Sequence, residues 1–226
     1  TDDYPIIFID SNASYANNSG AGVITWSVKD SSGDYCNTAS IRSQIDAAPS
    51  NDSAPGRLQF MTTTSGTTPT TKMTIDSAGR VSKSYQPFAM VHIQTQSGRS
   101  TTGSQIVVPW DIIHTNSTSS NVGNHFNTSN HRFTAPINGR YLFVVSLNIV
   151  GDNIVYHRIN GTNRHGGEYR MTQLVWDHAD TSFIYDMNAN DYYDTTSQLY
   201  NGSGSRFNGG ANSGFGWDCL SIYLLG

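Results

Sequence analysis

The sequence contains little charge, and this shortage limits both its fold and its partners. Only 13% of the 226 residues are charged, the formal net charge is −4, and Glu168 is the single glutamate. No Lys/Arg cluster is present that could grip phosphates, which argues against a nucleic-acid partner. Serine, threonine, asparagine and glycine abound instead. Because the first three compete with the helix backbone for hydrogen bonds, long helices are not expected.

Long apolar runs and cysteines are scarce as well. No apolar segment is long enough to span a bilayer and no signal-peptide pattern opens the chain, so we expect no membrane insertion. Cys36 and Cys219 are far apart in the sequence, and we expect free thiols, with a disulfide as the alternative. The chain begins at Thr1 without a methionine, which favours a fragment of a longer polypeptide.

Residue patterns for catalysis and metal binding are lacking too. None of the seven histidines belongs to a His-x-x-x-His, His-Glu or His-x-His pair, the spacings typical of metal sites. No Gly-x-Ser-x-Gly elbow is found. Asp177-His178 near Asp180 would suit an acid/base cluster, but the segment is more typical of a hydrated polar loop. We therefore predict a protein that is not an enzyme and needs no cofactor.

Three further aspartates could in principle form a glycosidase pair. They are Asp186, Asp191 and Asp194. Asp191 ends the tetrapeptide Asn188-Ala-Asn-Asp191, which has the composition of a tight turn. We expect structural roles for these carboxylates. A polysaccharide depolymerase is accordingly the least favoured alternative.

The best-defined strand pattern lies between residues 141 and 149. Apolar residues alternate with a mixed set, which is typical of a strand buried on one face. The apolar set is Tyr141, Phe143, Val145, Leu147 and Ile149. Pro136-Ile-Asn-Gly139, just before it, has turn chemistry. Further strands are expected at 6–9, 22–28, 41–45, 57–62, 72–75, 88–93, 132–134, 154–159, 168–175, 182–187, 192–200 and 216–225.

The aromatic and turn residues around this strand follow a recognisable spacing. Trp110-Asp111 is followed by Asn116, Phe126 and Phe133, and then by Thr134-Ala-Pro136 and Gly139-Arg-Tyr-Leu-Phe143. This series resembles the central signature of the C1q/TNF-like jelly roll. Trp110 replaces the usual Phe, and the segment between Asn116 and Phe126 is about five residues longer than usual. The resemblance implies a jelly-roll sandwich that assembles as a homotrimer and binds ligands without catalysis.

A second resemblance covers part of the N-terminal third. Pro55-Gly-Arg-Leu-Gln-Phe-Met-Thr-Thr63 and Lys72-Met-Thr-Ile-Asp-Ser-Ala-Gly-Arg-Val81 resemble a hairpin of bacteriophage tail fibres. Its Asp76–Gly79 tetrad predicts a type I turn followed by a glycine. The region before residue 84 has few apolar residues for a core of its own. A trimer that wraps three chains around an axis would solve that problem.

Together these features predict an all-β protein with two parts. Residues 1–83 would form a β-rich, trimeric shaft or neck, and residues 84–226 a C1q-like jelly-roll tip that binds a receptor. The resemblances imply the distal region of a phage tail fibre, located on the virion and extracellular. Its partners would be two further copies of itself, the rest of the fibre, and a bacterial surface polysaccharide or protein. A soluble C1q/TNF-like binding or signalling module is the alternative.

The binding residues are expected in loops at the end of the jelly roll away from the shaft. Aromatic rings stack on sugar C–H faces while polar groups bond hydroxyls, so rings beside polar side chains suit glycan recognition. The loops after Ile149, Val175 and Tyr200 have this composition. The predicted ligand-binding residues are Trp176, Asp177, His178, Arg206, Phe207, Asn208, Asp152 and Asn153.

Overall fold

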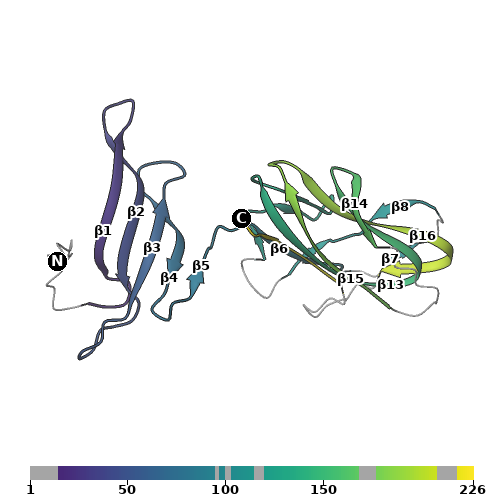
Figure 1. The fold of residues 1–226 in the computed structure, drawn as a ribbon, viewed down its shortest axis with the longest axis horizontal. Helices are drawn as coiled ribbons and strands as arrows, with labels where there is room; N and C mark the ends of the chain where they lie inside the picture. The colour runs from purple at the N-terminus through teal and green to yellow at the C-terminus, as the bar shows by residue number, and fades with distance from the viewer. Residues whose placement is uncertain (1–14, 95–96, 100–102, 115–119, 168–176, 208–217) are drawn as a thin grey trace, which may run out of the picture. The chain divides into compact units, whose positions relative to one another are not determined.

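All regular structure in this protein is β-strand. The computed structural model describes residues 15–94, 97–99, 103–114, 120–167, 177–207 and 218–226, and no helix occurs among them (Figure 1). The all-β prediction is therefore confirmed. Within these residues there is no helix of the length and apolarity that crossing a membrane requires. The chain divides into two compact units, Thr1–Tyr85 and Gln86–Gly226.

The N-terminal unit contains one antiparallel sheet with its strands in sequence order. Its strands are β1 (Gly20–Lys29), β2 (Tyr35–Ile45), β3 (Gly56–Thr62), β4 (Thr70–Ile75) and β5 (Val81–Ser82). The turn from β4 to β5 is the predicted one: the Gly79 amide donates to the Asp76 carbonyl at 2.9 Å, and Gly79 has φ of +78°. Glycine suits that position because it adopts positive φ without a steric penalty.

The C-terminal unit holds the remaining strands. They are β6 (Phe88–His92), β7 (Ser97–Arg99), β8 (Gln105–Val107), β9 (Ile112–Ile113), β10 (Asn121–Val122), β11 (Phe126–Asn127), β12 (Arg132–Thr134), β13 (Gly139–Ile159), β14 (Thr162–Gly167), β15 (Asp177–Met187), β16 (Tyr192–Phe207) and β17 (Cys219–Leu224). The predicted strands at 6–9 and 168–175 lie outside the described residues. Both cysteines are free thiols, as expected.

The strands of the C-terminal unit pair in a nested order. The first long strand, β6, pairs with the last, β17, and β12 pairs with β16. The first half of β13 pairs with β15 and its second half with β14. This arrangement is a hairpin rolled up on itself, which is the topology of a jelly roll. The jelly roll predicted from the sequence is thus present.

Two sheets face each other across one apolar core. The first contains β6, β17, the first half of β13, and β15; the second contains β11, β12, β16, the second half of β13, and β14. The Phe143 and Tyr193 rings, one from each sheet, lie 4.4 Å apart, and the Phe133 and Tyr141 rings lie 5.6 Å apart. All five apolar residues of the predicted strand at 141–149 are buried, which confirms its inward face.

Strand β13 belongs to both sheets because it bends between them. Its first half runs to Ile149, and its second half pairs with β16 from Asn153 onward. Gly151, at the bend, has φ of +94°, and the register shifts on both sides of Asp152. Such bulges bend a strand and strengthen its twist. The bend carries one continuous strand around the edge of the sandwich (Figure 1).

Candidate functional site

The segments predicted to bind a ligand do converge on one end of the sandwich. Ile149 pairs with Asp177 of β15 and with Phe207 of β16, and Val150 pairs with Arg206. Phe88 and the beginning of β13 lie at one end of the C-terminal unit, because both pair with Tyr223. Strand β13 runs away from that end toward Ile149, so these backbones lie at the opposite end. We call this the distal end, formed by residues 148–153, 177–178, 201–207 and 218.

The local structure of the distal end differs from the prediction. Residues 150–153 were expected as a loop but continue β13, and residues 201–207 continue β16. The reason is tertiary: Asp152 pairs with Asn201, and Ser205–Phe207 pair with β7 on their other side. Polar, glycine-rich segments like these form strands when partners on both sides satisfy their amides and carbonyls.

Two of the predicted ligand-binding side chains are in the interior. Phe207 is fully buried in the core. Asn153 is also fully buried, and its amide nitrogen donates to the carbonyls of Val150 and Gly151 at 3.1 and 2.8 Å. These contacts brace the bend of β13. For Phe207 and Asn153 the prediction of direct ligand contact is therefore corrected: their roles are packing and support of the backbone.

The other predicted residues stand as follows. His178 is exposed and its Nε2 lies 3.0 Å from Nδ2 of Asn148. For Asp152, Asp177 and Arg206 the structure describes only the backbone. Trp176 and Asn208 lie outside the described residues. The Asp177-His178-Asp180 segment is the beginning of a strand rather than the polar loop expected from its composition.

A buried carboxyl group supports the distal end. Asp218 is fully buried, and its Oδ1 accepts a hydrogen bond from the Asn148 amide. Its Oδ2 has no hydrogen-bond partner among the described residues. Burial raises the pKa of Asp218 to about 8, and the bond from Asn148 offsets only part of that shift. The carboxyl is thus protonated at neutral pH, which avoids an unpaired buried charge.

This carboxyl makes stability depend on pH. The pKa of an aspartate in an unfolded chain is about 3.9, so between that value and about 8 the folded state holds a proton that the unfolded state has lost. Stability therefore falls as pH rises through this window. From pH 5 to 7.5 we expect a loss of about 2–3 kcal/mol in the free energy of unfolding.

Urea titrations of the parent and Asp218→Asn at several pH values measure this effect. The asparagine keeps an oxygen for the Asn148 amide but cannot ionise. The difference in stability between variant and parent should therefore grow with pH in favour of the variant. A constant difference across the window would contradict the assignment.

A pair of histidines lies beside Asp218 on the outer face of the same sheet. His92 Nε2 is 2.6 Å from His114 Nδ1, and His92 Nδ1 is 3.3 Å from the Asp218 carbonyl oxygen. That carbonyl only accepts, so Nδ1 of His92 carries the hydrogen and its Nε2 accepts from His114 in the neutral pair. Burial and the nearby His114 lower the pKa of His92.

None of these polar partners was singled out from the sequence. Asn148 stood on the mixed face of the predicted strand, which indicated a partly covered position but no role. Asp218 and His92 lie 70 and 56 residues away from it along the chain, and only the strand pairing brings them together. Neither had a local pattern from which the contact could be predicted.

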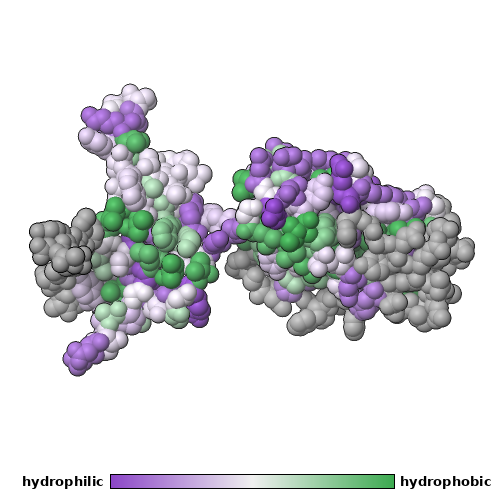
Figure 2. Space-filling view, in the orientation of Figure 1, coloured by the Kyte–Doolittle hydropathy of each residue, from purple (hydrophilic) through white to green (hydrophobic). Residues whose placement is uncertain are grey.

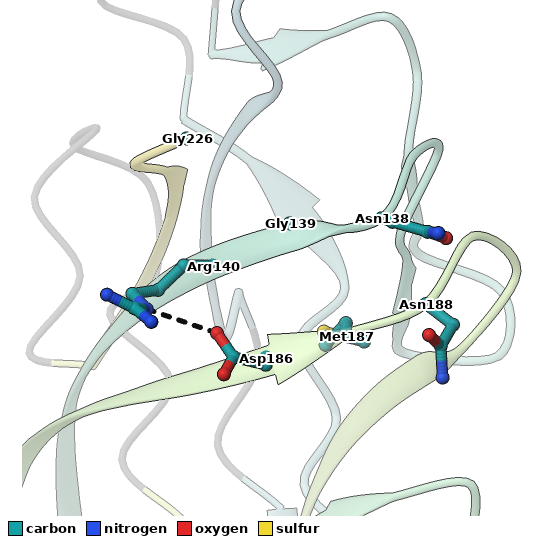
Figure 3. A pocket seen from close by; sticks show the side chains of 7 residues that line it. All are labelled: Asn138, Gly139, Arg140, Asp186, Met187, Asn188 and Gly226. Carbon is teal, nitrogen blue, oxygen red and sulfur yellow. Dashed lines mark hydrogen bonds and ion pairs between the residues drawn. The ribbon is translucent and has the colours of Figure 1, made fainter.

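A pocket of about 590 Å³ opens at the opposite end of the C-terminal unit (Figure 3). It is lined by Asn138, Gly139, Arg140, Asp186, Met187, Asn188 and Gly226. Arg140 Nε donates to Asp186 Oδ1 at 3.1 Å, and both side chains are mostly exposed. A Cβ at Gly139 would come within 2.6 Å of Cδ1 of Leu224, so a larger residue there would require the Leu224 side chain to move. No predicted ligand-binding residue lines this pocket.

The three aspartates considered as a glycosidase pair are all engaged. Asp186 pairs with Arg140. Asp191 holds the Asn188–Asp191 turn by accepting from the Asn188 amide at 2.8 Å. Asp194 is fully buried between Arg158 and Arg132. These contacts assign each carboxylate a structural role, as the sequence predicted for this group.

Within the described residues, no three His, Cys, Asp or Glu side chains lie close enough to hold a metal ion.

The comparisons with known proteins find similarity in structure and not in sequence. No family model matches the sequence, and no curated protein matches it. Among solved structures, the globular domain of a zebrafish complement 1qA protein is similar to this chain, with a TM-score of 0.46 and 11% sequence identity over 62% of this chain and 98% of that chain.

Proposed function

We propose that this chain is the distal region of a phage tail fibre, a non-enzymatic, homotrimeric protein that attaches the virion to a glycan on the bacterial surface. The observation that carries the proposal is the convergence of β13, β15 and β16 at the distal end of a jelly roll. A rigid sandwich that presents several segments at one end is a typical platform for recognition. The tail-fibre assignment itself rests on the hairpin resemblance in residues 55–81.

The chemistry of the distal end fits a polar, uncharged ligand. His178 is exposed and presents its imidazole on β15, while the Asn148 carboxamide beside it at the end of β13 is buried, with Nδ2 3.0 Å from His178 Nε2. A neutral imidazole both donates and accepts hydrogen bonds, as sugar hydroxyls require. The predicted aromatic Trp176 directly precedes the paired residue Asp177. A ring there would supply the apolar stacking surface that glycan binding needs.

The outer face of the β6-β17-β13-β15 sheet supports a homotrimer. Phe88, Tyr223, Leu142 and Ile184 are cross-strand neighbours in one row. Tyr223 is 40% exposed and Ile184 55%, and the Phe88 and Tyr223 rings lie 4.7 Å apart. An exposed apolar row on a folded sandwich favours burial against another copy. A soluble C1q/TNF-like binding module would have the same apolar row. Binding to host cells distinguishes the proposed attachment function from this alternative.

Trp176→Ala tests the receptor site. Aromatic anchors dominate binding energy at such surfaces and typically contribute 2 kcal/mol or more, so we expect binding to host cells to weaken by about 30-fold or more. The melting temperature and the mass of the assembly should stay close to those of the parent. Binding of purified protein to host cells and to a glycan array measures the effect.

Ile137→Ala serves as the control, because Ile137 is 50% exposed at the opposite end of the unit. It should bind as the parent does. If Trp176→Ala bound host cells as tightly as the parent and Ile137→Ala do, the receptor site would lie elsewhere. If the parent bound neither cells nor any glycan, the attachment function itself would fail.

A further inference from the structure

The sheet of the N-terminal unit has one face made of apolar side chains. The strand register places Ile24, Ile41, Phe60 and Met73 in a single row across β1 to β4. Alternate residues on each strand share a face, so the residues two positions away lie beside this row, and they are apolar or glycine except for the uncharged Ser43, Thr62 and Thr71. We call the set the apolar face: Ile24, Trp26, Ala39, Ile41, Leu58, Phe60, Met73, Ile75 and Val81.

The opposite face of the same sheet is polar, and its side chains form hydrogen bonds with one another. Arg42 donates two hydrogen bonds, at 3.0 and 2.8 Å, to the side-chain oxygen of Gln59, its cross-strand neighbour. Arg57 bonds Gln44 in the same way and pairs with Asp46 at 3.2 Å. Gln44 and Gln59 are themselves buried within this network, at 8% and 9% exposed. The sheet is therefore strongly two-sided.

Among residues 15–85, the apolar face is not covered by a second layer. Ile24 is 46% exposed, Trp26 50% and Val81 55%, and within this range Ile45 is the only large apolar side chain that is buried. The five strands described in this range lie in one layer. Figure 2 shows the hydrophobic residues gathered on this sheet. An isolated sheet with a bare apolar side needs a partner layer to be stable.

We infer that the apolar face is an interface between copies of this chain, with three sheets packed face-inward around a common axis. The face carries no charge, so it offers nothing to a charged partner and is complementary to a surface as apolar as itself. A second copy presents that surface at equal concentration. Cyclic assembly then buries the same residues on every copy at once.

The area of the face sets how much surface assembly would bury. Five strands about 4.8 Å apart and about six residues long, at 3.4 Å per residue, give roughly 450 Å² in projection. Each copy would bury this face once, which gives roughly 900 Å² in a pair and roughly 1,350 Å² in total over the three contacts of a trimer, so the choice of three copies comes from the proposed homotrimer and not from the area. The inference names the surface that holds the proposed homotrimer together in this unit, and it rests on that proposal.

Two adjacent residues provide a matched test. Ile24 is on the apolar face and Val23 on the polar face, and their exposed fractions in the single chain are similar, 46% and 52%. In the 226-residue chain, Ile24→Cys should react with a maleimide at least about tenfold more slowly than Val23→Cys. The rate of the parent, which retains Cys36 and Cys219, is subtracted. Light scattering of the same samples at micromolar concentration should give three times 24.7 kDa.

The outcomes separate the inference from the proposal beneath it. A trimer in which both thiols react at equal rates would overturn the inference and leave the homotrimer standing. A monomeric parent would overturn both. Protection of the Ile24→Cys thiol in a monomer would show that the same chain covers the face, which also overturns the inference. In support, Ile24→Asp should restore maleimide access to Phe60→Cys in the same chain, whereas Val23→Asp should not.

Discussion

Replacing Phe143 by alanine should lower the free energy of unfolding by about 3–5 kcal/mol, the range for emptying a buried phenylalanine site. Phe143 is fully buried and its ring stacks on Phe183 at 4.9 Å and meets Tyr193 at 4.4 Å. It therefore joins both sheets of the sandwich. The neighbouring aromatic rings cannot close the cavity without leaving their own packing positions.

Urea unfolding followed by circular dichroism measures this loss, with Ile137→Ala as the control. Ile137 is half exposed in a turn, so the control should stay within about 0.5–1 kcal/mol of the parent. A Phe143→Ala protein that melted like the parent would mean that the inward face of β13 is assigned wrongly. The comparison tests the core of the C-terminal unit directly.

Replacing Asp194 by alanine should have an effect of similar size for an electrostatic reason. Its buried carboxylate accepts hydrogen bonds from Arg158 Nε at 2.7 Å and from Arg132 Nε at 3.2 Å. The Arg158 side chain is itself only 17% exposed. Removing the carboxylate leaves two guanidinium groups close together, one of them largely out of water. Breaking a buried pair in this way costs about 3–5 kcal/mol.

Asp186→Ala is the matched control, because it breaks an Arg–Asp pair on the same unit that is mostly exposed. Exposed pairs contribute about 0–1 kcal/mol, so this variant should unfold almost like the parent. Thermal and urea unfolding of the two variants measure the contrast. Equal losses would show that burial of Asp194 does not determine the strength of its pairs.

Local patterns predicted the parts of this fold whose neighbours are close in sequence. The alternation from Tyr141 to Ile149 identified both the strand and its buried face, and Asp76–Gly79 identified a turn that forms as expected. In each case the deciding interactions, side-chain alternation or a bond within four residues, are written in consecutive residues. The nested pairing of the jelly roll was reached only through the resemblance around Trp110.

What the sequence could not predict depends on partners far along the chain. Residues 150–153 and 201–207 have the composition of loops, yet each completes the other's backbone hydrogen bonding as a strand. The same pairing draws Phe207 into the core. The composition of these segments is that of loops, and it does not specify the register between β13 and β16. The contact of Asn148 with Asp218 could not be predicted from the sequence for the same reason.

The pairing of the first and last strands of the jelly roll has a mechanical consequence. The chain enters the C-terminal unit next to Phe88, and β6 is held along its length by β17, from Tyr223 beside Phe88 to Leu220 beside Val91. A pull between that entry point and the distal end would run along the strands. It would load these hydrogen bonds in shear, so that they resist together, rather than peel them apart one at a time. Under the proposed attachment function, tension between the bound surface and the rest of the chain would act along this direction.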